Sequence, residues 1–269
     1  MPRRPPAWKP DWAALRAQAL DIRLPTTPGG HVYVIADAHL GDLRATPEDF
    51  LAMLGRLPNA RAIVFLGDLF KVWLAPPKFW NAPVRAVMEG FARLRTTGVP
   101  IVFVVGNREF LLPSGSAGAA RMHLPFDWIV HGMAVLHWGG RRYGLTHGDL
   151  VNREDAQYLR WRRMSRGTLL TSLFPALPAP LARAVAARLE ASLANTNQAI
   201  KIHYPADEVL AFAEALTPGL DAVLIGHFHR DETVPPAPGR GYLRIVPDWF
   251  SRKTLLRLDP GGAITRLQF

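Results

Sequence analysis

Two histidines, His227 and His229, stand one residue apart directly after Gly226, at the end of the apolar run 222–225. On an extended strand, residues i and i+2 point to the same face, so the two imidazoles are expected to share a face and to grip one object, such as a metal ion. Satisfied surface histidines, or a packing accident at the end of a strand, are competing explanations, because short histidine motifs recur by chance. The other potential ligands in the chain decide between these explanations.

Each of several short apolar segments ends in a side chain that can bind a metal ion. Active sites of open α/β sheets gather outside the carboxyl ends of the strands, so these side chains are expected to meet. Imidazole, carboxylate and amide ligands without thiolate suit Mn²⁺, Fe or Zn²⁺. The set is too large for one ion, and with one bridging carboxylate it fits two ions about 3.5 to 4 Å apart. The segments are 31–39, 61–68, 99–107, 141–149 and 221–229, and the ligands are Asp37, His39, Asp68, Asn107, His147, His227 and His229.

Glycines flank these ligands, at Gly67, Gly106, Gly148 and Gly226. A residue without a Cβ lets the backbone turn sharply and come close to a metal ion or a phosphate. Any one of them is also explained as an ordinary glycine between a strand and a loop, and the group as a whole favours the functional explanation.

The elements that must position the ligands follow from the same apolar segments, which are short and rich in β-branched residues and therefore predict buried strands. Helical patterns at 47–57 and 83–95 lie between the early strands, in the alternation typical of βαβ units. A short helix is expected from Asp11 to about Asp21, and the tail segments 241–246, 253–258 and 263–269 predict a strand meander. The expected fold class is an α/β sandwich of two central sheets, the second partly antiparallel, in a single domain over residues 1–269.

Residues 151–205 interrupt this alternation and predict a helical lid insertion, while residues 1–30 form an N-terminal arm and helix. Basic and apolar side chains together suit a helix that rests on an anionic membrane surface or lines an acyl-chain groove. An ordinary lid packed on the domain is the alternative. The arginines considered are Arg153, Arg160, Arg162, Arg163, Arg166, Arg183 and Arg188, and the apolar residues are Leu169, Leu170, Leu173, Phe174, Leu177, Leu181, Val185 and Leu189.

The composition excludes several classes of function. The chain has 269 residues, of which 49% are hydrophobic and 20% charged, so it can bury a full core. It has no cysteine, which excludes thiolate catalysis and disulfides and leaves only nitrogen and oxygen as metal ligands. Without a spanning apolar run or a secretory signal segment, the protein is expected to be soluble and cytoplasmic. The net charge of +10 favours an anionic partner: nucleic acid, a phosphorylated small molecule or an anionic membrane surface.

The blocks "DAH", "GD", "GN", "THGD" and "GHFH" occur in the order found in the calcineurin-like metallophosphoesterases, and this resemblance covers roughly residues 31–230. Within that superfamily the chain resembles the UDP-2,3-diacylglucosamine hydrolases of lipid A synthesis. The finer resemblance rests on "ADAHL", "LGDLFKVW", "GNREFLL", "HGD" followed by Asp155 and Tyr158, "LFPALP" with "AARLEAS", and "GHFHR".

The resemblance implies two divalent ions, most simply Mn²⁺, and an assignment of ligands to each. Asp68 is expected to bridge the ions, with Asn107, Arg108 and His147 as the catalytic residues. Two departures stand out, because Lys71 replaces the family's usual acid and Glu109 replaces the aspartate of "GNRD"; the insertion also aligns poorly. The first ion is assigned to Asp37, His39, Asp68 and His229, the second to Asp68, Asn107, His147 and His227, and the substrate to Arg108, Asp155, Tyr158, Asn197 and Lys201.

Some residues near these motifs have two readings. Arg108, beside the ligand Asn107, suits a phosphate through its planar fork of donors, although it is also one surface arginine in an arginine-rich chain. Asp149 is expected either to orient the imidazole of His147 or to cap the helix that follows. Trp73 is expected to be a packing residue. The remaining histidines are expected to be structural or exposed, and they are His31, His123, His131, His137 and His203.

The sequence therefore predicts a dinuclear metal hydrolase that cleaves the pyrophosphate of UDP-2,3-diacylglucosamine through an activated water, without a covalent intermediate. The implied partners are the diacylated nucleotide sugar and the inner face of the inner membrane, to which the protein is expected to bind peripherally. A phosphodiesterase or nuclease of the same superfamily is the alternative, which the positive charge allows. A non-enzymatic basic binding protein is a third hypothesis, against which the intact ligand set argues.

Overall fold

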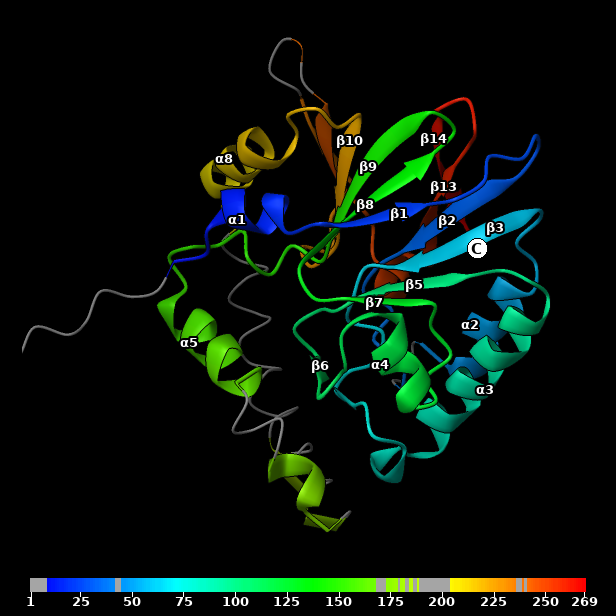
Figure 1. Ribbon diagram of the computed structural model, residues 1–269, viewed down its shortest axis with the longest axis vertical. Helices are drawn as coiled ribbons and strands as arrows, with labels where there is room; N and C mark the ends of the chain where they lie inside the picture. The colour runs from blue at the N-terminus through cyan, green and yellow to red at the C-terminus, as the bar shows by residue number, and fades with distance from the viewer. Residues whose placement is uncertain are drawn as a thin grey trace, which may run out of the picture.

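The computed structural model describes residues 9–41, 45–167, 173–178, 204–235 and 241–269, together with positions 180, 181, 184, 185, 188 and 239. Two six-stranded sheets form its centre (Figure 1). The first sheet is mixed, with parallel pairing of β9, β10 and β12 at its centre and antiparallel pairing of β8 with β9. Its strands, in spatial order, are β1 (Leu20–Arg23), β8 (Met133–Trp138), β9 (Arg141–Thr146), β10 (Ala222–Ile225), β12 (Tyr242–Ile245) and β11 (Glu232–Val234).

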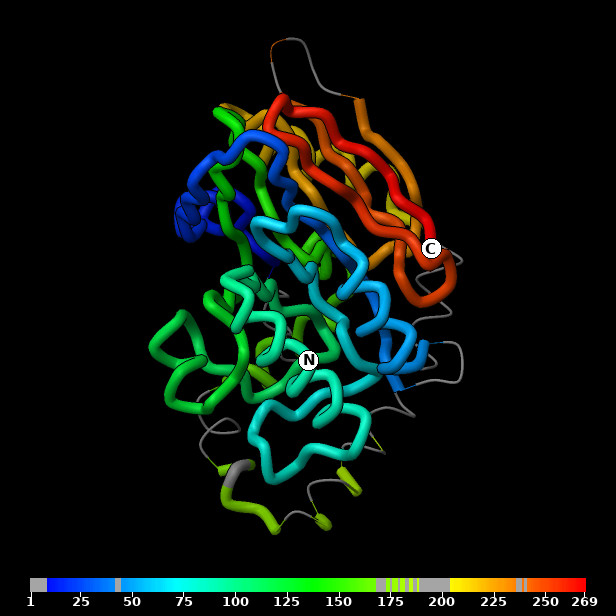
Figure 2. Tube along the Cα trace, turned by 90° about the vertical axis from the view of Figure 1, so that its right-hand side faces the viewer, coloured from blue at the N-terminus to red at the C-terminus, as the bar shows by residue number. Residues whose placement is uncertain are grey.

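The second sheet is also mixed. Its parallel part runs from β2 through β3 and β5 to β7, and its other edge is an antiparallel hairpin of β13 and β14. In Figure 2 this hairpin, coloured red, runs along one flank of the upper half of the molecule. The spatial order is β14 (Ile264–Gln268), β13 (Thr254–Leu258), β2 (His31–Ile35), β3 (Ala60–Phe65), β5 (Ile101–Val104) and β7 (Trp128–Val130), and β4 (Trp73–Leu74) pairs with β6 (Glu109–Phe110) in a separate small sheet.

Helices cover the outer faces of both sheets, as Figure 1 shows. Apolar side chains fill the space between the sheets, including Val34, Val64 and Leu224. A second apolar cluster joins the second sheet to α2 and α3, and a third joins the first sheet to α1 and α8. The helices are α1 (Trp12–Ala17), α2 (Pro47–Leu54), α3 (Ala82–Thr96), α4 (Gly115–Arg121), α5 (Ala156–Ser165), α8 (Ala206–Leu216) and α9 (Trp249–Arg252), with short 3₁₀ turns η1 (Pro77–Phe79) and η2 (Phe174–Ala176).

The predicted α/β sandwich of two mixed sheets is confirmed, as are the strands expected from the long apolar segments and the helices at 47–57 and 83–95. Two local predictions are wrong. The helix expected from Asp11 to Asp21 ends at Ala17, and the chain then forms the edge strand β1, which pairs with β8. The tail is not one meander, because β12 pairs in parallel with β10 in the first sheet while β13 pairs with β2 in the second.

The N-terminal segment packs against the start of the insertion. The indole nitrogen of Trp12 donates a hydrogen bond to the carbonyl oxygen of Leu150 at 2.9 Å, and the guanidinium of Arg153 lies over the Trp12 ring. Lys9 forms an ion pair with Glu154. Within the described part of the chain, no helix is both long and apolar enough to cross a membrane.

Candidate metal centre

The proposed metal ligands lie in loops that follow the strands. The backbones of Asp37, His39, Asp68, His227 and His229 adopt left-handed φ values between 44° and 70°. Such values are uncommon for residues other than glycine and cost of order 1–3 kcal/mol each, and they cluster at functional sites. The expectation that the two histidines share a strand face is therefore wrong, because β10 ends at Ile225 and the chain coils before it reaches either imidazole.

Two of the flanking glycines are required by close approach. A Cβ on Gly226 would lie 2.6 Å from the carboxylate oxygen Oδ2 of Asp37, and a Cβ on Gly106 would lie 2.5 Å from Oδ1 of Asp68. Both distances are far inside van der Waals contact, so a larger residue at either position would displace a proposed ligand. These contacts support the expectation that the glycines let the backbone approach the site.

One group of potential ligands joins the two sheets. Atoms of Asp37, His39 and His229 all lie within 4.8 Å of one another. The Nε2 atoms of the two histidines are 3.2 Å apart, and Nε2 of His229 is 3.7 Å from Oδ1 of Asp37. Oδ1 of Asp37 is buried and accepts no hydrogen bond from the described residues, although buried polar atoms are nearly always paired. An orphaned buried oxygen beside two imidazoles fits a divalent cation.

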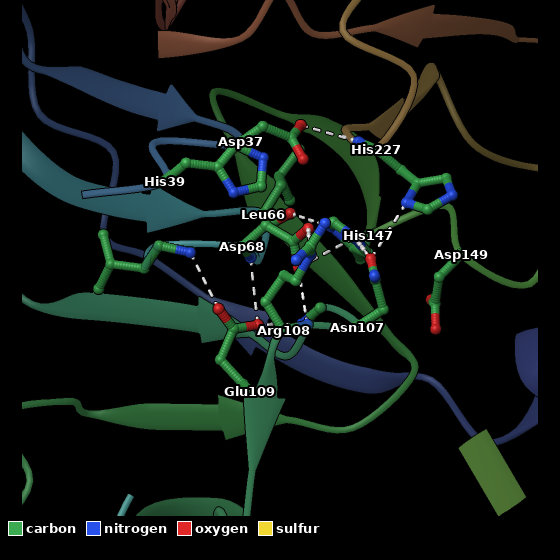
Figure 3. Close-up of polar contacts among 12 residues, drawn as sticks. Asp37, His39, Leu66, Asp68, Asn107, Arg108, Glu109, His147, Asp149 and His227 are labelled. Carbon is green, nitrogen blue, oxygen red and sulfur yellow. Dashed lines mark hydrogen bonds and ion pairs between the residues drawn. The ribbon is translucent and has the colours of Figure 1, made fainter. Parts of the chain in front are cut away.

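A second group brings together Asp37, Asp68 and His147, again within 4.8 Å. Oδ1 of Asn107 lies 2.9 Å from Nε2 of His147 and 3.2 Å from Nδ1 of His227, and Figure 3 shows the two rings converging on this amide. Nδ1 of His147 lies 2.7 Å from the carbonyl oxygen of Leu66 and donates to it, which leaves the lone pair of Nε2 directed at Asp68 and Asn107. Asp37 belongs to both groups, so the structure brings all the proposed ligands into one centre.

Burial shapes the charge of this centre. It raises the pKa of Asp37, and the neighbouring carboxylate of Asp68 raises it further. Burial also raises the pKa of Asp68, although His147 and Arg108 oppose this. For His227, burial and the nearby His147 lower the pKa to about 3, so the ring is neutral near pH 7. A neutral imidazole beside mutually repelling buried carboxylates matches the donor set of divalent cations such as Mn²⁺ or Zn²⁺.

Glu109 supports the loops of the metal centre without being one of the proposed ligands. Its carboxylate accepts hydrogen bonds from the backbone nitrogens of Asp68 at 3.1 Å, Leu69 at 2.9 Å and Gly106 at 2.7 Å (Figure 3). Burial and the charge of Asp68 raise the pKa of this carboxyl to about 8. The residue that departs from the family's "GNRD" thus holds the two loops that carry Asp68 and Asn107 together, and the ligand positions are preserved.

Asp248 is a buried acid that the sequence prediction missed. Its Oδ2 lies 3.7 Å from Nδ1 of His229, and the same oxygen caps α9 by accepting from the backbone of Ser251 at 2.7 Å. The backbone nitrogens of Trp249 and Phe250 donate to the carbonyl oxygens of Ala36 and Asp37. The turn at Asp248 therefore packs behind the first group of ligands and supports their positions. A signal was available, because Asp248 closely follows a strand expected from sequence, 241–246, as the ligands follow theirs.

The structure places Arg108 and Asp149 in other surroundings than the sequence predicted. Arg108 is buried, with Nε 3.8 Å from Oδ2 of Asp68 and Nη1 donating to the carbonyl oxygen of Lys71 at 3.4 Å. Both predictions for Asp149 are wrong: the carbonyl of Leu66, not Asp149, orients His147, and Asp155 caps the following helix. Trp73 is confirmed as a packing residue, buried against Phe70 and Phe103.

The proposed substrate-binding residues are only partly described. Asp155 caps α5 through the backbone nitrogen of Tyr158, whose own hydroxyl donates to Asp149. Asn197 and Lys201 lie outside the described residues, as do Arg183, Leu169, Leu170, Leu189 and His203. Among the other histidines, His31 pairs with Asp259, His137 pairs with Asp21, His131 contacts the carbonyl of Pro113 and His123 is exposed.

The family model of the calcineurin-like phosphoesterases matches residues 30–231, the range that contains every proposed metal ligand. The chain belongs to this family. Curated relatives of this phosphoesterase include proteins named UDP-2,3-diacylglucosamine hydrolase. The one from Xanthomonas campestris pv. campestris (strain B100) is 33% identical over 85% of this chain and 95% of its own length. Those from Stenotrophomonas maltophilia (strain K279a) and Aeromonas salmonicida (strain A449) are each 32% identical, covering 85% and 84% of this chain and 94% and 89% of their own.

Solved structures similar to this phosphoesterase include a novel archaeal phosphodiesterase, with 12% identity, a TM-score of 0.43 and coverage of 89% of this chain and 99% of that one. Vps29 from Chaetomium thermophilum matches with 14% identity and a TM-score of 0.42, over 89% of this chain and 97% of its own. The family assignment rests on the sequence match. As a calcineurin-like phosphoesterase with a curated relative at 33% identity, the protein is a metal-dependent hydrolase.

Proposed function

We propose that this phosphoesterase hydrolyses the pyrophosphate bond of UDP-2,3-diacylglucosamine to give UMP and 2,3-diacylglucosamine 1-phosphate. The observation that carries the substrate is the name shared by relatives that match over 85% of the chain and up to 95% of their own length. The two groups of converging oxygen and nitrogen donors support the reaction class, because two-ion centres are suited to displacement at phosphorus.

Two Mn²⁺ ions are the proposed cofactors. Asp37, His39 and His229 would hold one ion, and Asn107, His147 and His227 the other, with Asp68 shared between them. Bound divalent cations supply Lewis acidity toward the phosphoryl oxygens and toward water. The protein's contribution is to fix the donors before substrate arrives: the Leu66 carbonyl sets the tautomer of His147, and Glu109 fixes the loops of Asp68 and Asn107.

Arg108 is proposed to bind the phosphoryl oxygens through its guanidinium. Its backbone nitrogen donates to Oδ1 of Asp68 at 3.0 Å, so its position is tied to that of the shared ligand. Burial in a low-dielectric site strengthens a charge-assisted hydrogen bond to phosphate. Asp155, Tyr158, Asn197 and Lys201 are proposed to contact the rest of the nucleotide sugar.

The insertion is proposed to receive the acyl chains and to meet the inner face of the inner membrane. Phe110, which follows Arg108 and Glu109, lies in an apolar cluster with Phe79 and Leu74, and the described insertion residues Trp161, Phe174 and Leu177 pack against it. Leu173, Leu181 and Val185 are exposed apolar side chains on the same segment. Apolar surface near the phosphate site suits a substrate with both a pyrophosphate and fatty acyl groups.

The test presents purified protein and Mn²⁺ with the diacylated nucleotide sugar and, separately, with its deacylated form and a generic phosphodiester. Release of UMP that is fastest from the diacylated substrate, and that is abolished by a chelator and restored by Mn²⁺, is the expected result. Equal or faster hydrolysis of the generic phosphodiester would reject this substrate.

A phosphodiesterase or nuclease acting on another nucleotide substrate is the second candidate, and the net charge of +10 favours it. Binding of single-stranded or duplex nucleic acid that weakens steeply with salt, together with Mn²⁺-dependent cleavage of that nucleic acid, would support it. Binding without cleavage would indicate nonspecific attraction alone.

A further inference from the structure

Helix α5 leads from the metal centre into the insertion, and two arginines at its C-terminal end, Arg162 and Arg166, point inward. Figure 1 shows α5 below α1, on the side of the molecule away from α2 and α3. Nε of Arg162 donates to Oδ2 of Asp149 at 2.7 Å, and the two side chains are only 15% and 4% exposed. The hydroxyl of Tyr158 donates to the same oxygen at 2.5 Å. One buried carboxylate, two residues after the ligand His147, is thus held by two side chains of α5.

Arg166, one turn further along, reaches the other half of the second ligand group. Its Nη2 donates to the carbonyl oxygen of Gly106 at 2.7 Å, and this is the peptide that leads directly into Asn107. The backbone nitrogen of Gly106 donates to Glu109, so both peptide groups that flank Gly106 are held by hydrogen bonds. Hydrogen bonds from a guanidinium are about twice as strong as neutral ones.

We infer that Arg162 and Arg166 are positioning residues that couple the docking of α5, and with it the root of the insertion, to the geometry of Asn107 and His147. The inference rests on the proposed two-ion centre. Neither arginine needs to touch substrate or metal, since each acts on the backbone or loop that carries a ligand. The other ligand group, Asp37, His39 and His229, is supported instead by Asp248 and the turn after it.

The energetic asymmetry of buried charge makes the coupling strong. With α5 docked, Asp149 is a buried charge whose lost hydration is compensated by the guanidinium of Arg162 and the hydroxyl of Tyr158, so removal of either partner while the helix stays docked is costly. Coupling between two sites is also reciprocal. If undocking of α5 weakens the binding of an ion by Asn107 and His147, then binding of that ion must, by the same free energy, oppose the undocking of α5.

The experiment compares the wild type with Arg166→Met, which keeps an unbranched apolar stem but removes the guanidinium donors, and with the exposed Arg93→Ala of α3 as control. Titration calorimetry with Mn²⁺ is expected to show two binding steps in the wild type and the control. In Arg166→Met one step should weaken about 10- to 100-fold while the other is unchanged, because supporting contacts of metal ligands typically have effects of this size. Arg166→Lys should restore part of the loss.

Hydrogen exchange supplies a readout that does not depend on activity. In the metal-free protein, Arg166→Met should speed amide exchange at Asn107 and Arg108 but not in β3. In the wild type, Mn²⁺ should slow exchange in α5, and this protection should be lost in Arg166→Met. Should the Arg166 variant fail to fold, Arg162→Lys and Tyr158→Phe are measured in the same way.

Unchanged exchange at residues 107 and 108 in the folded variants would overturn the inference whether or not ions are bound. Uptake of fewer than two Mn²⁺ ions by the wild type would instead contradict the two-ion centre of the proposed function, and the metal-free exchange data would still decide the coupling.

Discussion

The Nε2 atoms of His39 and His229 face each other at 3.2 Å, although the two residues follow strands of different sheets. His39 follows β2 of the second sheet, and His229 follows β10 of the first. The two rings are stacked, with an interplanar angle of 27°. In a hydrogen bond between the two rings, one Nε2–H donates to the lone pair of the other Nε2, whereas a divalent cation would accept both lone pairs at once. This pair is therefore the point at which one ion would tie the two sheets together.

Removing the shared carboxylate should empty both ion sites, whereas removing His229 should mainly empty one. Asp68 lies 3.5 Å from Nε2 of His147 and is proposed to bridge both ions, so Asp68→Ala should lower bound metal from about two ions to none, with loss of activity. His229→Ala should retain about one ion. Metal counting per chain by elemental analysis measures both, with thermal melts to establish folding. Equal metal loss in the two folded variants would contradict the bridge.

Arg108→Ala should lower kcat more than it raises KM. The guanidinium is proposed to act on phosphoryl oxygens whose charge grows in the transition state, and removal of one such donor typically costs about 10²–10³ in kcat. Metal content should not change. Steady-state kinetics on the nucleotide sugar, together with metal counting, test this. An effect confined to KM, with full turnover at saturating substrate, would contradict the role of Arg108 in stabilising the transition state.

Asp248→Asn should weaken the binding of one ion only. The carboxylate lies 3.7 Å from Nδ1 of His229, where it favours the tautomer that leaves Nε2 free to bind a metal. Loss of such a contact typically lowers metal affinity about 10- to 100-fold. Mn²⁺ titration of the variant should show a weakened step and an unchanged one. Asp248 also caps α9 by accepting from the backbone nitrogen of Ser251, and an asparagine can still make this cap, so thermal melts that match the wild type would exclude a purely structural effect. Weakening of both binding steps would contradict the assigned role.

The contribution of β1 to the stability of the protein should depend on pH through the pair of Asp21 and His137. Oδ1 of Asp21 lies 2.6 Å from Nε2 of His137. The hydrogen bond to His137 lowers the pKa of Asp21. A lowered folded pKa stabilises the protein above the ordinary aspartate value of about 3.9, and that contribution is lost as pH falls through the folded pKa. Asp21→Asn should therefore be less stable at pH 7, by less than about 1 kcal/mol because the pair is largely exposed. Urea unfolding should show this difference shrinking below pH 4, and a constant difference would contradict it.

The strands that carry the ligands could be predicted from sequence because most of them are apolar runs buried on both faces, and parallel strands bring their carboxyl ends to one edge. β1 could not, since of its residues Leu20–Arg23 only Ile22 is buried. The tail was misjudged because local patterns reveal strands but not partners: β12 and β13 are neighbours in sequence, yet they pair with β10 and β2 in different sheets.

The site shows the same division. The types of the ligands and their positions after strands could be predicted from the sequence. The contacts that support the ligands could not, because they depend on which distant residues the fold brings together. An arginine in an arginine-rich insertion gives no sign that it faces inward, as Arg166 does toward Gly106. The reading of the insertion's arginines as one membrane-facing set is accordingly corrected for Arg162 and Arg166, which point into the protein, while Arg160 and Arg163 are exposed.

Replacing residues 167–193 with a short Gly/Ser linker should separate the chemistry from the recognition of lipid. Every proposed metal ligand lies outside the insertion, and Arg162 and Arg166 are retained, so hydrolysis of a small soluble phosphodiester should be spared. Each buried methylene of an acyl chain contributes about 0.8 kcal/mol to binding, so a few such contacts would dominate affinity for the diacylated substrate. Its hydrolysis, and association with anionic vesicles, should therefore fall sharply.

The linker variant must first bind two Mn²⁺ ions and melt cooperatively, because Phe174 and Leu177 also pack against the cluster around Phe79. Phe174→Ala alone serves as a milder variant that leaves the chain length unchanged. With folding and metal binding established, the ratio of hydrolysis rates for diacylated and deacylated nucleotide sugar is the deciding quantity. A ratio equal to that of the wild type would reject the insertion as the acyl-chain site, and it would favour the phosphodiesterase or nuclease alternative, for which no acyl recognition is needed.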